Sequence, residues 1–144
     1  MKHFIKILFI VIISSTTGCC YAQKMVTKIR DAKKLEINKE QFIGKPLKFL
    51  IDQIGPKIKF AYGNPNNKGE SIIGTNIKFY FADETEYWKR HKENQTPTAI
   101  LVTFKLEPNN TRKPIPVGGV KWTAELANEY GDMIISRIYV SGEN

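Results

Sequence analysis

One short segment of the sequence groups residue types that suit ligand binding. It reads Tyr87-Trp88-Lys89-Arg90-His91-Lys92, so two aromatic rings stand beside three cations and a histidine. Aromatic rings next to cations suit the binding of a sugar, an anionic polymer or a protein partner. The segment therefore predicts a binding site, whose candidate residues are Tyr87, Trp88, Arg90 and His91. The alternative interpretation is structural: Trp88 is buried against a sheet and Arg90 only pairs with Glu86.

The rest of the sequence offers little catalytic chemistry. Both cysteines lie within the first 20 residues, and His91 is the one histidine after His3. The sequence therefore does not support thiol catalysis or a zinc site built from several histidines. It also does not support a Ser–His–Asp triad in a Gly-x-Ser-x-Gly turn. General acid–base catalysis by a pair of carboxylates remains an alternative. We interpret the candidate residues as helix caps and solvated helix surface; they are Asp83, Glu84, Glu86, Glu125, Glu129 and Asp132. We expect no catalytic residue, no metal and no cofactor.

The first 22 residues have the three parts of a secretory signal peptide. Lys2 and Lys6 supply the positive start, and an unbroken apolar run follows from Ile7 to Ile13. This run is much shorter than the roughly 20 apolar residues of a membrane-spanning helix. Cys20-Tyr21-Ala22 then offers small residues at the two positions that a signal peptidase reads. The sequence predicts export to the periplasm or the extracellular space, with cleavage after Ala22.

A second cleavage site stays open. Thr16-Thr17-Gly18-Cys19 is similar to the lipobox of bacterial lipoproteins, in which the cysteine becomes the lipidated first residue. The lipobox usually carries leucine three residues before the cysteine, where this chain has Thr16. Lipidation at Cys19 is therefore the alternative to soluble export.

Positive charge is concentrated in the first third of the exported chain. The formal net charge is +8, and removal of Lys2 and Lys6 with the signal lowers it to +6. Residues 23–59 hold ten basic and four acidic side chains, whereas residues 60–144 hold ten of each. We interpret 23–41 as a basic leader, either a spacer or a loosely docked helix. Its functional alternative is contact with anionic lipids or polymers of a cell envelope.

Residues 42–144 are predicted to form a single small α+β domain. A helix is expected from Leu47 to Ile54, because its apolar side chains follow the spacing of one helix face between Pro46 and Gly55-Pro56. Alternation with a period of two predicts strands over 58–62, 77–81, 98–106 and 133–140, and capping residues predict helices over 84–92 and 124–130.

This element order, α-β-β-α-β-α-β, favours an antiparallel sheet of about four strands with short helices on one face. The other face of such a sheet can meet solvent. Its residues are expected to include Tyr80, Thr103, Lys105 and Arg137.

Three stretches give the chain a resemblance to small exported proteins of the Bacteroidetes kind. They are the signal that ends in Ala22-Gln23, the segment Phe42-Ile43-Gly44-Lys45-Pro46-Leu47, and the C-terminal stretch from Trp122-Thr123-Ala124-Glu125 through Tyr130-Gly131-Asp132 to Val140-Ser141-Gly142. The resemblance implies a cell-envelope or extracellular location. It implies no activity.

These observations favour a small exported, non-enzymatic binding or protein-interaction module. Its expected partner is a protein or an anionic or glycan ligand of the envelope. Nucleic acid is not expected, since the cations are mostly lysines and no RNA-binding aromatic motif is present. Membrane contact is expected only through the signal peptide or a lipid anchor. The alternatives are a carboxylate-only enzyme acting on a cell-wall glycan and an inhibitor of a secreted hydrolase.

The two cleavage sites make different products. We expect an intact mass that begins at Gln23, because Cys20-Tyr21-Ala22 suits signal peptidase I better than Thr16 suits a lipobox. Mass spectrometry of the exported protein checks the new N-terminus. Metabolic labelling with a fatty acid that disappears in Cys19→Ser would contradict the expectation.

Overall fold

The computed structural model describes residues 23–64, 76–105 and 119–142. The expected signal peptide, the alternative lipidation site Cys19 and most of the expected loop between the third strand and the last helix lie outside the described residues. The described residues form an α+β domain around one antiparallel sheet, which confirms the predicted fold class.

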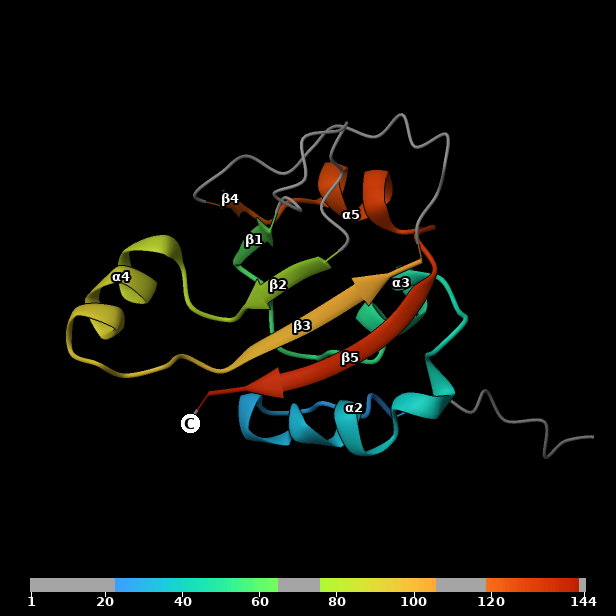
Figure 1. Ribbon diagram of the computed structural model, residues 1–144. Helices are drawn as coiled ribbons and strands as arrows, with labels where there is room; N and C mark the ends of the chain where they lie inside the picture. The colour runs from blue at the N-terminus through green and yellow to red at the C-terminus, as the bar shows by residue number, and fades with distance from the viewer. Residues whose placement is uncertain (1–22, 65–75, 106–118, 143–144) are drawn as a thin grey trace, which may run out of the picture.

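The sheet has five strands in the order β4-β1-β2-β3-β5 (Figure 1). Their bounds are β1 Phe60–Asn64, β2 Asn76–Tyr80, β3 Ala99–Phe104, β4 Val120–Lys121 and β5 Ile135–Ser141. Four of these strands follow the alternation of the sequence. The fifth, β4, is a two-residue strand beside β1 that was not predicted, because two residues are too few to show a period.

Alternation along the strands separates the two faces of the sheet. Ile77, Ile100 and Val102 point into the main core, which also holds Phe79 and Ile138. Successive strand residues point to opposite faces, so their neighbours lie on the second face. Phe60, Tyr80 and Ala99 on that face form a smaller buried cluster.

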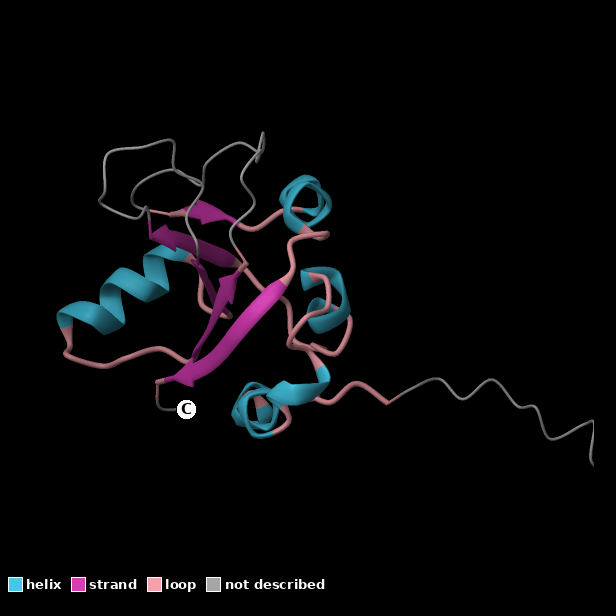
Figure 2. Cartoon of the chain, turned by 45° about the vertical axis from the view of Figure 1, so that its right-hand side comes forward, coloured by secondary structure: helices cyan, strands magenta, loops and turns pink. Residues whose placement is uncertain are grey.

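Short helices lie on both faces of the sheet, not on one as predicted. Their bounds are α2 Lys33–Ile37, α3 Leu47–Ile51, α4 Glu84–Lys92 and α5 Ala124–Tyr130, with 3-10 turns at Ile29–Asp31 and Lys39–Gln41. Figure 2 shows α4 on one side of the sheet and the other three helices on the opposite side. Tyr87 of α4 packs against Phe60 and Tyr80. Tyr80 is therefore buried, although the sequence suggested that it faces solvent.

The helix expected from Leu47 to Ile54 is shorter than predicted. It begins after Pro46 as expected and ends at Ile51. Ile54 is still buried, but it lies in an isolated parallel bridge with Val26. The Val26 N–H donates to the Gln53 carbonyl at 3.0 Å, and Gly55 N–H donates to the Val26 carbonyl at 2.7 Å. Pairing with a segment 28 residues earlier thus takes the place of another helical turn.

The Lys-rich segment 23–41 contributes to the main core. Val26, Ala32 and Leu35 are buried there with side chains of the sheet. The sequence suggested a spacer or a loosely docked helix, because the apolar residues of this segment show no clear period. The structure has a docked helix, α2, that lies beside β5.

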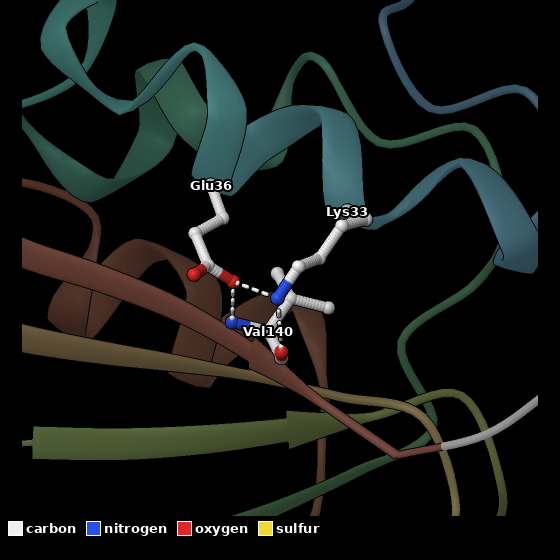
Figure 3. Close-up of polar contacts among 3 residues, drawn as sticks. All are labelled: Lys33, Glu36 and Val140. Carbon is white, nitrogen blue, oxygen red and sulfur yellow. Dashed lines mark hydrogen bonds and ion pairs between the residues drawn. The ribbon is translucent and has the colours of Figure 1, made fainter.

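Two charged side chains of α2 bind the backbone of the edge strand β5 (Figure 3). The Glu36 carboxylate accepts a hydrogen bond from Val140 N–H at 2.9 Å, and Lys33 Nζ donates to the Val140 carbonyl at 3.2 Å. Lys33 and Glu36 also pair with each other at 2.6 Å. Further along the same strand, Ile135 exchanges hydrogen bonds with the backbone of Gly44 and Lys45. Both ends of the β5 edge are therefore occupied by the chain itself, which protects it from pairing with another strand.

Substitution of Leu50 tests the packing of α3. Its side chain is fully buried, so Leu50→Ala should lower the free energy of unfolding by about 2–5 kcal/mol. The neighbouring Phe49 is 48% exposed, and Phe49→Ala should cost less than about 1 kcal/mol. Urea unfolding of both variants checks this difference. Equal losses in the two variants would mean that α3 does not bury the Leu50 face.

Substitution of Glu36 tests the contact between α2 and β5. Burial favours the neutral carboxyl group, but hydrogen bonds from Lys33 and Val140 outweigh it, so the pKa of Glu36 is lowered in the folded state. The contribution of Glu36 to stability is therefore full above the ordinary glutamate pKa of about 4.3 and is lost as the pH falls through the lower folded value. Glu36→Gln should cost about 1–2 kcal/mol at pH 7 and progressively less below pH ~4.

The control for this variant is Glu40→Gln, which removes an exposed carboxylate from the next turn. Urea unfolding from pH 3 to pH 7 gives the stability of both variants and of the wild type. A difference between Glu36→Gln and wild type that stays constant across this range would contradict the assignment.

Candidate anion-binding pocket

Helix α4 carries all four residues of the predicted binding segment. Asp83 begins the helix, since its carboxylate accepts a hydrogen bond from Glu86 N–H at 3.0 Å. The sequence predicted this cap and the helix bounds, and both are confirmed. Four basic residues lie in the last turn of α4. Positive charge is favoured there because the helix dipole is negative at the C-terminus.

Tyr87 lies on the side of α4 that meets the sheet, and the exposed His91 lies against it one turn further along the helix. The two rings stack with their centroids 6.0 Å apart and their planes 6° from parallel. Tyr87 also contacts Tyr80 at 4.8 Å and Phe60 at 5.7 Å between centroids. Burial raises the pKa of the Tyr80 phenol, with Tyr87 and Tyr62 adding to the effect. Tyr87 therefore packs α4 against the sheet.

Trp88 and Arg90 lie on different sides of α4. They are separated by about 200° around the helix, because each residue of an α-helix turns by about 100°. Trp88 is 42% exposed and packs edge-on against Tyr87 at 5.0 Å. Arg90 pairs with Glu86, with an N–O distance of 2.6 Å. The structure thus separates the tryptophan from the arginine that the sequence grouped into one site.

Arg90 lines a cavity of about 550 Å³ at one end of the sheet. The cavity brings together three segments: the turn at residues 28–30, the loop at 56–59, and α4 with the chain on either side of it. Five of the lining side chains are cationic and one, Glu86, is acidic. The cations are Lys28, Arg30, Lys57, Lys59 and Arg90.

Most of this positive charge is not neutralised by nearby carboxylates. Lys59 lies 3.9 Å from Asp83, and Arg90 pairs with Glu86. Among the described residues, no carboxylate lies within ion-pair distance of Lys28, Arg30 or Lys57. A cavity lined by one sign of charge concentrates the opposite charge. It is therefore a candidate site for an anion.

Asp31 stands next to Arg30 in the sequence, yet it is engaged elsewhere. Its carboxylate accepts hydrogen bonds from the Thr27 hydroxyl at 2.8 Å and from Lys28 N–H at 3.0 Å. Hydrogen bonds from Thr27, Lys34 and Lys28 lower the pKa of Asp31 to about 2. The carboxylate is thus held within its own turn and is not among the residues that line the cavity.

Two neighbouring cavities of about 430 Å³ are less strongly charged. One shares Lys57 and Lys59 with the basic cavity but adds the carboxylates of Asp83 and Glu84. The other shares Lys57 and adds Lys24 and Asp52. Of these three cavities, the one beside Arg90 has the largest excess of cations over carboxylates.

Of the five cations of this cavity, only Arg90 was predicted from the sequence as a ligand-binding residue. Lys28, Arg30, Lys57 and Lys59 come from segments that show no ligand-binding motif. The excess of basic residues in 23–59 was the available signal, and all four lie within that range. Their convergence on α4 depends on the fold.

The described residues contain no group of three His, Cys, Asp or Glu side chains that could hold a metal ion. In the same part of the chain, no helix is long and apolar enough to cross a membrane. Comparison of the chain with protein-family models, with curated proteins and with solved structures finds no match.

Proposed function

We propose that this protein is a small exported, non-enzymatic binding module that takes an anionic ligand in the cavity beside Arg90. The observation that carries the proposal is the set of five cationic side chains around one concave site, with Glu86 as the only carboxylate of the lining. Concave sites with a few convergent polar groups are the usual form of ligand sites. The export signal and the resemblance to small exported proteins support an envelope or extracellular setting.

The lining also defines the shape of the ligand. Apolar side chains stand among the cations, namely Ile29, Pro56, Phe81, Ala82 and Pro97. Arg30 and Arg90 offer planar forks that suit carboxylate or phosphate groups. The ligand is therefore a compact anion with at least two negative charges and an apolar part, such as a phosphorylated or polycarboxylated small molecule.

A carboxylate-only enzyme is less well supported by the same residues. A general acid needs a carboxyl group whose pKa is raised toward the working pH. Among the described carboxyl groups, Asp31, Glu36 and Glu125 have pKa values shifted in the opposite direction, downward. Glu86, in the cavity, serves as the ion-pair partner of Arg90.

The proposal is tested by titration with inorganic pyrophosphate, a compact multivalent anion, followed by calorimetry at low salt. Arg30→Ala, Lys57→Ala and Arg90→Ala should each weaken binding about fivefold or more, since each removes a charge-assisted contact. Binding should also weaken with added salt. Because Arg30 and Lys57 are exposed, their variants should keep the wild-type melting temperature.

Two variants serve as controls. Lys105→Ala removes an exposed lysine outside the cavity, and Trp88→Ala truncates the opposite side of α4. Both should bind pyrophosphate within twofold of wild type. No pyrophosphate binding at low salt, or equal losses in Lys105→Ala and Lys57→Ala, would refute the anion site.

A further inference from the structure

The second face of the sheet carries a row of side chains that no described helix covers. Tyr62, Lys78, Leu101 and Tyr139 are direct neighbours across β1, β2, β3 and β5. Cross-strand partners share one face. Figure 1 looks onto this face, and no described helix passes in front of β2, β3 or β5.

The row lies just beyond the part of the face that α4 occupies. Tyr87 of α4 packs on Phe60 and Tyr80, which form the adjacent row. One row further, Tyr139 is 48% exposed, and Lys33 Nζ lies 5.2 Å from its ring centroid. Lys78 Nζ lies 5.6 Å from the Tyr80 ring, at the border between the two rows. The row thus has a tyrosine at each end and a lysine and a leucine between them; Tyr139 is exposed, and Tyr62, Lys78 and Leu101 are half-buried.

The charge of this face is positive. The next row adds Arg137, which is exposed and stands opposite Thr103. Among the described strand residues that point to this face, none is acidic. A second copy of the chain would bring like charges together, which disfavours self-association through this face. Its occupant should be acidic.

The size of the row distinguishes between acidic occupants. Three strand spacings separate the two tyrosines, about 14 Å, and one row is about 7 Å deep. Even two rows cover on the order of 200 Å², far below the roughly 800 Å² that each partner buries in a stable protein interface. A narrow strip of this length suits a linear chain a few units long.

We propose that this strip, defined by Tyr62, Lys78, Leu101, Tyr139 and Arg137, binds a linear acidic polysaccharide. The apolar C–H face of a sugar ring packs against the electron-rich face of a tyrosine ring. Lys78 and Arg137 pair with carboxylates of the chain. The strip shares none of these residues with the cavity beside Arg90, so the two sites are independent.

The test uses calorimetry with a hexamer of galacturonic acid as the probe and a neutral hexamer of glucose as its uncharged counterpart. Tyr139→Ala and Arg137→Ala should each weaken binding of the acidic hexamer at least fivefold, and Tyr139→Phe should retain it. Phe49→Ala is the matched control, because Phe49 is equally exposed and also lies under a lysine, with Lys45 Nζ 4.6 Å from its ring. It should bind as wild type does.

Other outcomes overturn the proposal. The wild type failing to bind the acidic hexamer, or Tyr139→Ala binding it as well as wild type, would mean that the strip is not the site. Equal affinity for the neutral hexamer would remove the role of charge. Tighter binding of a thymidine oligonucleotide would assign the strip to nucleic acid. Arg30→Ala should leave hexamer binding unchanged, and a loss there would mean that the sugar chain occupies the cavity instead.

Discussion

Strand β5 forms one edge of the sheet, and its outward N–H and C=O groups need partners that another chain could otherwise supply. The protein supplies them from its own first third. Glu36 and Lys33 bind the two backbone groups of Val140, and the chain at Gly44 and Lys45 binds those of Ile135. These contacts join residues about 100 positions apart and fix the Lys-rich segment against the sheet.

That attachment also determines where the positive charge lies. The segment is held at a second point by the bridge between Val26 and Ile54. Between these two attachments the chain turns at residues 28–30, which places Lys28 and Arg30 around the same cavity as Arg90 of α4. Helix α4 in turn covers only part of the second face of the sheet. The same arrangement therefore creates a basic cavity at the end of the sheet and leaves the row from Tyr62 to Tyr139 uncovered by any described helix.

The sequence predicted those parts of the fold that depend on residues close together in the chain. The Asp83 cap defined the start of α4, Pro46 defined the start of α3, and alternation defined β2 and β3. Features that depend on distant partners were not predictable. The end of α3, the burial of Tyr80 and the pairing of Glu36 with Val140 each require a neighbour far along the chain. The cavity is the clearest case, because the sequence showed an excess of lysine in 23–59 but not the surface on which those lysines meet Arg90.

The most direct test of the anion site is to locate a bound anion. Crystals of the protein soaked in sodium tungstate would reveal the position of this dianion by anomalous scattering. We expect the strongest protein-bound peak inside the cavity, within reach of Arg30, Lys57 and Arg90. A cavity without a peak in crystals that bind tungstate elsewhere on the surface would contradict it.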